Sequence, residues 1–508
     1  MSKLNQANEA VKSASYNGNV QYKKSPEQQL YELAVTSMYG KDNYYETNKK
    51  QIERAKDLML TLVKAGKHDV IANIIIHART DMYIRSMPIV MTVQFAEALR
   101  IANKTYPALR TLVRDVIQRA DQITDLYAVA LSTFGGKKFI PTAIKNGVAD
   151  AFLKFNAYQI EKYNRAGAVK LRDVLQIVHP KAKTKLQGEL FSQIITDTVP
   201  TPYTWETELS INGTLPADKK KTDTQLWTEL VSSGKLGYMA LLRNLRNIIT
   251  AGVDADLQAR VIATLTDPEE IAKNKQLPFR YINAQKAITG SGPNWLRAIN
   301  NALNQSFVNV PKIGENVWII IDCSGSMEGG YSTRQTGTAP IDTAVLFAAA
   351  LVKANADSAN VRVTMFSNNA EHVDVNPDDT VTSIAAYLRG KVYGGGTALQ
   401  SALNLKSKLG FEPDTVVVLS DMQVDRLDRA NPSSYFTNEC VKVAINLDAY
   451  ESTPIGDLNG WFQLSGFSER LFDMIPAMRE QGSVAKRFNH AYEPAVVKIP
   501  YDLQDKKG

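Results

Sequence analysis

At 508 residues the chain is too long for one hydrophobic core, and a typical domain size of ~150 residues predicts two to four domains. Its 44% hydrophobic and 22% charged residues exclude a wholly disordered chain. The charge is uneven, with 42 basic and 28 acidic residues from Met1 to Ile313 but 17 basic and 24 acidic residues in the remainder. A basic part joined to an acidic part predicts that the first contacts a polyanion, although basic residues that only keep helix surfaces soluble would give the same counts.

The first residues, MSKLNQANEA, are polar and lack the apolar core of a secretory signal, so we expect residues 1–24 to be a flexible N-terminal segment. No part of the sequence approaches the ~20 uninterrupted apolar residues of a membrane helix. Two cysteines, Cys323 and Cys440, are too few for a disulfide framework, and both lie in runs typical of buried strands. We therefore expect a reduced, cytoplasmic protein with no membrane partner.

From Ser25 to Asn304 the pattern is almost entirely helical. Apolar residues recur at three- and four-residue intervals in IERAKDLMLTLVKAG and TLVRDVIQRADQI, with short breaks at positions such as Gly66 and Pro141. Short helices of this kind bury their apolar faces against neighbouring helices, as in an α-solenoid. At ~40–47 residues per HEAT-like repeat, the segment 25–313 has room for about six or seven repeats.

At Glu315 the pattern changes. The apolar run ENVWIIID is followed by a loop and the helical pattern IDTAVLFAAALVKA, and VRVTMFS, TVVVLSDM and CVKVAINLDAY are further β-branched runs. This alternation predicts a doubly wound α/β domain with a parallel sheet over 314–485. The remaining residues, 486–508, form a C-terminal tail.

Oxygen-bearing side chains follow two of these strands and a glycine run. Asp322, Ser324 and Ser326 come directly after the first strand, Thr397 follows three glycines, and Asp421 closes another strand. Because ligand sites of doubly wound sheets lie at the carboxyl ends of strands, these residues predict one site for a divalent cation. The ligands suit Mg²⁺ best and are also compatible with Mn²⁺ or Ca²⁺. A serine-rich loop that merely forms a turn is the alternative for the first three residues alone.

The complete set resembles the metal-ion-dependent adhesion site of von Willebrand factor type A (vWA) domains. The resemblance implies that the metal binds a partner's carboxylate and that no hydrolysis takes place. A degenerate site that keeps the fold without metal is the alternative.

The densest basic stretch runs from Lys137 to Lys185 and holds eleven basic against three acidic residues. Lys and Arg at this density predict salt-dependent binding to phosphates. Tyr158, Tyr163 and His179 lie among them and could stack on RNA bases. The alternative is that Tyr158 and His179 are half-buried packing residues, and for His179 we slightly favour packing.

Part of this stretch, KNGVADAFLKFNAYQIEKYNRAGAVKLRDVLQIVHPKA, resembles the signature of TROVE-domain proteins, the family of the Ro autoantigen and its bacterial relatives. TWETELS, GYMALLRNLRNI, LPFRYINA and LSGFSERLFDMI resemble further segments of that family in the same order. The resemblance implies a monomeric ring of HEAT-like repeats closed by the vWA domain. Such rings bind single-stranded ends of misfolded RNA in a central hole and small noncoding Y RNAs on the outer surface.

Basic residues and a histidine of the matching segments are the candidates for RNA contact. They are Lys137, Lys138, Lys162, Arg165, Lys170, Arg172, His179, Lys181, Arg243 and Arg246.

We therefore expect a non-enzymatic, RNA-binding ribonucleoprotein component that acts as a scaffold or chaperone in RNA quality control. The vWA metal site would recruit a protein partner, such as an exoribonuclease in bacterial relatives. The alternative is a vWA protein-binding or co-chaperone module whose basic solenoid binds an acidic protein. A metal-dependent nuclease is a third class, but the sequence has no carboxylate cluster for two metals and no phosphate-binding P-loop.

Overall fold

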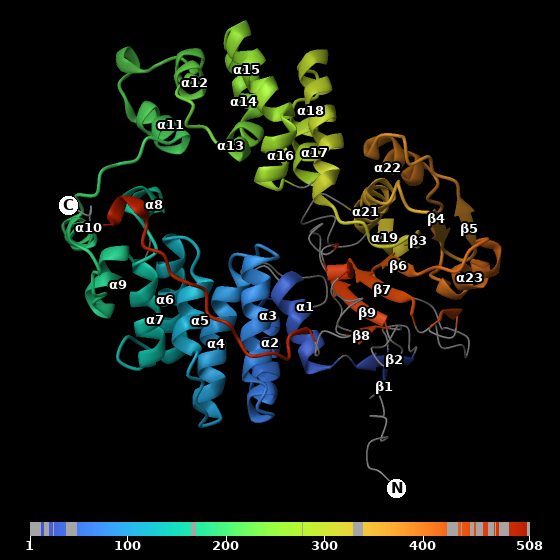
Figure 1. Cartoon of the computed structure of the whole chain (residues 1–508), viewed down its shortest axis with the longest axis horizontal. Coiled ribbons are helices and arrows are strands. Elements are labelled where there is room, and N and C mark those ends of the chain that lie inside the picture. Colours follow the sequence, from blue (N-terminus) through green and yellow to red (C-terminus); the bar gives the residue numbers. More distant parts are fainter. Residues whose placement is uncertain are drawn as a thin grey trace. The chain divides into compact units, whose positions relative to one another are not determined.

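The computed structural model describes residues 12–14, 20–23, 25–36, 48–163, 169–276, 278–328, 339–423, 435–437, 439–447, 452–453, 461–465, 472, 474–476 and 487–504. The chain divides into two compact units (Figure 1). Unit 1 combines Met1–Phe155, Arg165–Asp197 and Lys312–Gly508, and unit 2 combines Asn156–Asn164 and Thr198–Pro311. The helical segment that the sequence predicts as one domain is therefore divided between the two units.

The helical part of unit 1 consists of short amphipathic helices. They are α1 (Pro26–Thr36), α2 (Asn48–Lys64), α3 (His68–Thr80), α4 (Met87–Ile101), α5 (Leu109–Val116), α6 (Asp121–Phe134), α7 (Thr142–Phe152), α9 (Leu171–Val178) and α10 (Lys185–Thr196).

These helices pack in two layers. One layer stacks α1, α3, α5, α7 and α9 in turn, and the other stacks α2, α4 and α6 (Figure 1). Side chains such as Ile74, Phe95 and Leu126 are fully buried between the layers. Each pair of helices thus buries its apolar faces against the next pair, as expected of HEAT-like repeats. The predicted α-solenoid is confirmed, whereas its closure into a ring stays a prediction.

Unit 2 is also helical. It contains α8 (Ala157–Tyr163), α11 (Trp205–Thr214), α12 (Asp223–Ser232), α13 (Tyr238–Arg243), α14 (Leu245–Ala251), α15 (Ala255–Thr266), α16 (Pro268–Asn274), α17 (Pro278–Ala287) and α18 (Pro293–Gln305).

Side-chain caps explain where several of these helices begin. The Thr204 and Thr222 hydroxyls accept the backbone N–H of Thr207 and Gln225, and Asp254 accepts that of Leu257. Inside the unit, the buried Tyr238 hydroxyl lies 2.8 Å from the Tyr281 hydroxyl and donates to the Leu265 carbonyl. Unit 2 therefore has a core of its own.

The α/β part of unit 1 is built on a six-stranded sheet with the order β5-β4-β3-β6-β7-β9. Its strands are β3 (Asn316–Asp322), β4 (Asn360–Phe366), β5 (Ala370–Val373), β6 (Thr415–Ser420), β7 (Val441–Asn446) and β9 (Trp461–Ser465). The helices connecting them include α19 (Gly325–Glu328), α21 (Pro340–Ala354), α22 (Val381–Gly390) and α23 (Leu399–Leu403).

All neighbouring strands of this sheet run parallel except β5, which pairs antiparallel with β4. The predicted α/β domain is confirmed, and the edge strand β5 is an addition to the predicted parallel sheet. A short connection after β4 explains it, since only a hairpin fits there. Cys323 and Cys440 are buried free thiols at strand ends, as expected.

The N-terminal segment 1–24, which we expect to be flexible, contains two strands among its described residues. Residues Lys12–Ala14 (β1) and Val20–Lys23 (β2) form an antiparallel hairpin. β2 also pairs antiparallel with Ser452–Thr453 (β8). These two strands and β8, from the distant C-terminal part, thus form a three-stranded sheet.

The C-terminal residues from Arg487 to Gln504 form an extended strap over the helices of unit 1, drawn in red in Figure 1. Asn73 of α3 donates its side-chain N–H to the carbonyls of Phe488 and His490, at 3.1 and 2.7 Å. At the far end, the Thr184 hydroxyl donates to the Leu503 carbonyl at 2.6 Å. The strap therefore joins helices that lie far apart along the solenoid.

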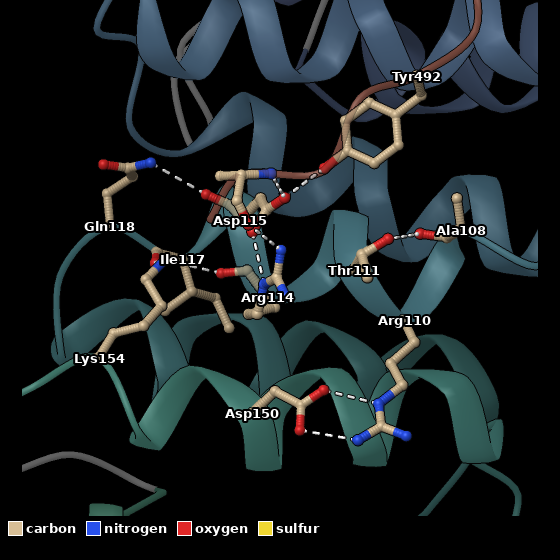
Figure 2. Close-up of polar contacts among 11 residues, drawn as sticks. Ala108, Arg110, Thr111, Arg114, Asp115, Ile117, Gln118, Asp150, Lys154 and Tyr492 are labelled. Carbon is tan, nitrogen blue, oxygen red and sulfur yellow. Dashed lines mark hydrogen bonds and ion pairs between the residues drawn. The ribbon is translucent and has the colours of Figure 1, made fainter. Parts of the chain in front are cut away.

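Asp115 of α5 is the main anchor of the strap (Figure 2). Its carboxylate is 2% exposed and accepts the Tyr492 hydroxyl at 2.6 Å and the Ala495 N–H at 2.9 Å. Arg114 pairs with the same carboxylate at 2.7 Å and donates to the Ala495 carbonyl. Hydrogen bonds to a buried charge stabilise more than neutral ones, so this cluster fixes the strap.

Below the cluster, Arg110 of α5 binds Asp150 of α7 with two parallel hydrogen bonds of 2.6 and 2.8 Å (Figure 2). The bond joins successive helices of one layer. Helix α5 is therefore bonded through side chains both to α7 and to the strap.

Replacing Tyr492 by Phe removes one donor to the buried Asp115 carboxylate, and we expect it to lower the free energy of unfolding by roughly 1.5–3 kcal/mol. Tyr501→Phe is the matched control, because Tyr501 lies in the same strap with 90% of its side chain exposed. Urea denaturation of the full chain, followed by circular dichroism, measures both variants. Equal loss of stability in the two variants would contradict the anchoring role of Asp115.

Candidate metal centre and basic surfaces

The predicted metal ligands lie where three loops meet beside the carboxyl ends of β3 and β6. β3 ends at Asp322, β6 ends immediately before Asp421, and the two strands are parallel neighbours. The Ser420 hydroxyl donates to the Asp322 carboxylate at 2.6 Å, which joins the two strand ends directly. Parallel pairing therefore brings together two carboxylates that are distant in sequence.

The serines of the first loop complete this group. The Ser324 and Ser326 hydroxyls are 3.1 Å apart, and the Ser324 N–H donates to the Asp322 carboxylate at 2.9 Å. Ser326 also forms a side-chain hydrogen bond with Asp421. Four of the five predicted ligands thus belong to one hydrogen-bonded cluster.

The glycine loop brings the fifth, Thr397, next to the cluster. The Gly325 N–H donates to the Gly395 carbonyl at 3.0 Å, two residues before Thr397, and the Thr397 side chain is buried. Gly395 has a φ of 110°, and a Cβ there would lie 3.0 Å from the Asn368 amide nitrogen. Both conditions favour glycine at position 395.

The backbone after Asp421 is unusual as well. Met422 is a buried non-glycine residue with a φ of 62°, and its N–H donates to the Ser420 hydroxyl at 2.9 Å. Sparsely populated backbone conformations of this kind cluster at functional sites.

The two carboxylates of this cluster are buried, with Asp322 0% and Asp421 2% exposed. Burial raises the pKa of Asp322, and the neighbouring Asp421 charge raises it further. Burial also raises the pKa of Asp421, opposed by hydrogen bonds that include one from Ser326. Two buried like charges are costly unless a cation neutralises them.

The chemistry of these side chains fits a hard divalent cation. Two carboxylates and three hydroxyls supply only oxygen donors, and Mg²⁺ prefers oxygen ligands and retains several waters. Within the described ranges, no group of three or more His, Cys, Asp or Glu residues has the arrangement of a metal site. The cluster therefore differs from a zinc site and from a carboxylate cage.

Most of the predicted RNA-binding residues lie around α9 and before α7 in unit 1. Lys170 is the N-cap of α9, Arg172 lies in its first turn, and His179 is its C-cap. Lys181 follows, and Lys137 and Lys138 lie in the turn after α6; apart from the half-buried Arg172, these side chains are exposed.

The slightly favoured prediction of a packing role for His179 is wrong. Its side chain is exposed, and its backbone has a left-handed φ of 46°. The end of α9 requires this conformation, since the His179 N–H closes the helix on the Leu175 carbonyl. Tyr158, for which packing was the alternative, is 46% exposed.

Three predicted residues belong to unit 2 instead. Lys162 lies on α8, Arg243 ends α13, and Arg246 lies on α14. Arg243 and Arg246 are exposed, whereas Asn244 between them is buried. Arg165, also predicted, lies outside the described residues.

Sequence reasoning missed Tyr203, Trp205 and Lys235, which line one pocket of unit 2 together with Tyr158 and Lys162. Tyr203 and Trp205 flank the cap residue Thr204 at the start of α11. Their signal in the sequence is weak, because aromatic residues near a helix start usually belong to a core.

Comparisons with known proteins agree with this architecture. Residues 197–307 match the TROVE domain model, and residues 317–423 match the von Willebrand factor type A domain model. The first match covers most of unit 2, and the second includes all five predicted metal ligands. No helix in the described part of the chain has the length and apolar character needed to cross a bilayer.

The crystal structure of the Ro (RSR) protein of Deinococcus radiodurans has a similar fold, with a TM-score of 0.64 and 18% sequence identity over 90% of this chain and 99% of that chain. Telomerase protein component 1 from Mus musculus is 37% identical over 87 residues, and that from Rattus norvegicus is 36% identical over 87 residues. These matches cover 17% of this chain and only 3% of each relative.

Two domain models in this order therefore identify a TROVE domain followed by a vWA domain, on a fold shared with a bacterial Ro protein.

Proposed function

We propose that this protein binds RNA and acts through binding rather than catalysis. The observation that carries the proposal is the group of basic side chains around α9 in a chain with a TROVE domain. Lys170, Arg172, His179 and Lys181 lie within or next to one eight-residue helix. Arg172 is 3.7 Å from Asp173, its carboxylate partner, and the two side chains are 41% and 50% exposed. Such a pair is weak in water, so the guanidinium is available to a phosphate.

Phosphate contacts of this kind supply affinity without sequence selectivity. Selectivity would come from single-stranded ends, whose bases are open to stacking, and from the shape of structured RNA. We therefore propose Y-type small noncoding RNA and the ends of structured or misfolded RNA as ligands. Their retention would make the protein a scaffold or chaperone in RNA quality control.

We further propose that the cluster of Asp322, Ser324, Ser326, Thr397 and Asp421 holds Mg²⁺. When bound, the cation supplies an open coordination position for a carboxylate of a partner protein. The five residues would hold it through their oxygen atoms, and the hydrogen bonds that join Asp322 to Ser420 and to the two serines keep those atoms in place. An exoribonuclease is a partner class that would give this site a role in RNA decay.

A protein-binding module whose basic solenoid binds an acidic protein is the second candidate. The buried, oxygen-rich cluster favours it, because a metal site of this kind serves partner binding whatever the helical part does. Gently purified protein free of nucleic acid, judged by its absorbance ratio, would support this candidate over the first.

For the RNA proposal, we compare the wild type with a Lys170/Arg172/Lys181 triple alanine variant. The ligand is a structured RNA with a single-stranded 3′ tail. We expect weaker binding, with a log–log salt dependence shallower by about one unit for each phosphate contact removed. Fluorescence anisotropy over a salt titration measures both quantities.

A Lys64/Lys104/Lys286 triple alanine variant is the matched control, since it removes the same charge from exposed positions outside the predicted set. Equal weakening in the two variants would assign the effect to net charge alone. Absence of wild-type binding at low salt would overturn the RNA proposal.

For the metal proposal, we expect MgCl₂ to raise the melting temperature of the wild type and to leave that of Asp421→Asn nearly unchanged. A cation at 100 times its dissociation constant stabilises the native state by about 2.7 kcal/mol. Asp374→Asn is the control, because the Asp374 side chain is 92% exposed in the same domain. Equal Mg²⁺ stabilisation of Asp421→Asn and the control would contradict the assignment of the site.

A further inference from the structure

A pocket of about 370 Å³ lies in unit 2 between α8, the start of α11, the end of α12 and the start of α13. Its wall includes the aromatic side chains of Tyr158, Tyr203 and Trp205, and Leu230 and Ala240 add apolar surface. Tyr158 is 46% exposed, so this wall is open to solvent.

Each of the three aromatic rings has a cationic side chain beside it. The Lys235 Nζ lies 4.9 Å from the centre of the Tyr203 ring, and the Lys162 Nζ lies 5.4 Å from that of Tyr158. The guanidinium carbon of Arg243 lies 5.8 Å from the Trp205 ring centre. Cation–π contacts of this geometry hold the charged groups next to the rings.

These cations keep their charge available. In the parts of the chain that the structure describes, neither Lys162, Lys235 nor Arg243 forms an ion pair with a carboxylate. One acidic residue, Glu206, lines the pocket, and it is exposed. The pocket thus combines flat apolar surfaces with unneutralised positive charge, which suits a flat ring attached to an anion.

We propose that this pocket takes an unstacked base of single-stranded RNA, which stacks on the aromatic wall while Lys162, Lys235 and Arg243 contact the flanking phosphates. The inference rests on the proposed RNA-binding function and assigns one site for it. Every base has a π-face, so stacking of this kind accepts any sequence. The buried Tyr238 does not take part through its hydroxyl, because that group is held by Leu265 and Tyr281.

Tryptophan fluorescence of the intact protein reports on this pocket. The chain has five tryptophans. Trp227, Trp295, Trp318 and Trp461 are at most 6% exposed, whereas Trp205 is half-buried and lines the pocket. A base that stacks in the pocket therefore quenches Trp205, and a base bound elsewhere leaves the emission unchanged.

The probe is a single-stranded oligouridylate of about ten nucleotides, which is within the usual site size of single-strand binders. We expect saturable quenching of the wild type and loss of that quenching in Trp205→Phe, which keeps an aromatic ring. Tyr158→Ala should weaken binding about 5- to 100-fold, in line with the loss of one stacked base. Tyr158→Phe should bind as the wild type does, because stacking needs the ring and not the hydroxyl.

Tyr387→Ala in the vWA domain is the matched control. Tyr387 is also 46% exposed and has a lysine, Lys391, 5.5 Å from its ring centre. Circular dichroism of each variant checks that the helices are intact. Equal affinities of Tyr158→Ala and Tyr387→Ala would overturn the pocket proposal.

Anisotropy of the labelled oligonucleotide separates this proposal from the one on which it rests. Binding by anisotropy without quenching of Trp205 would overturn the pocket and leave the RNA-binding function in place. No binding of this probe or of the structured RNA would overturn both. Quenching together with selective weakening by Tyr158→Ala is the expected result.

Discussion

Short helices that cannot bury their apolar faces alone constrain the whole helical part of this protein. Each face must be covered by a neighbouring helix, so α1 to α7 stack in two layers and the polar residues are left on the outside. Of the basic residues predicted to bind RNA, those such as Lys170, Lys181 and Arg243 lie on the surface, where phosphates can reach them. Polar contacts add to this packing. The bidentate Arg110–Asp150 contact joins α5 to α7, and Asp115 joins α5 to the C-terminal strap.

The α/β domain follows a different constraint. A parallel sheet brings the carboxyl ends of its strands to one edge, so β3 and β6 deliver Asp322 and Asp421 to the same place. Both carboxylates are buried, and the cost of burying two like charges is the physical reason for the cation that we propose at this cluster. Hydrogen bonds from Ser420 and Ser326 orient the oxygens. The Ser420–Asp322 contact that joins the ends of β3 and β6 therefore also fixes the positions of the candidate ligands.

The predicted basic residues are divided between the two units. Those around α9 belong to unit 1, whereas Lys162, Arg243 and Arg246 belong to unit 2. In the second group, Lys162 and Arg243 lie beside the aromatic rings of Tyr158 and Trp205. In our proposals, the α9 surface contributes phosphate contacts and the pocket of unit 2 contributes stacking on a base.

The sequence by itself determined the change from helical to α/β structure at Glu315. It also determined the alternation of strands and helices in the vWA domain and the five candidate metal ligands. These features depend on local periodicity and on the residues that follow each strand, so a short stretch of sequence is enough to reveal them. Only the tertiary structure decided the division of the helical part, the antiparallel strand β5, the pairing of β2 with β8 and the pocket around Trp205. The bond between Asp115 and Tyr492 joins residues 377 positions apart, and no local pattern encodes such a contact. Burial and exposure of single polar side chains, as for His179, follow from the packing of all neighbouring elements and so appear only when the chain is folded.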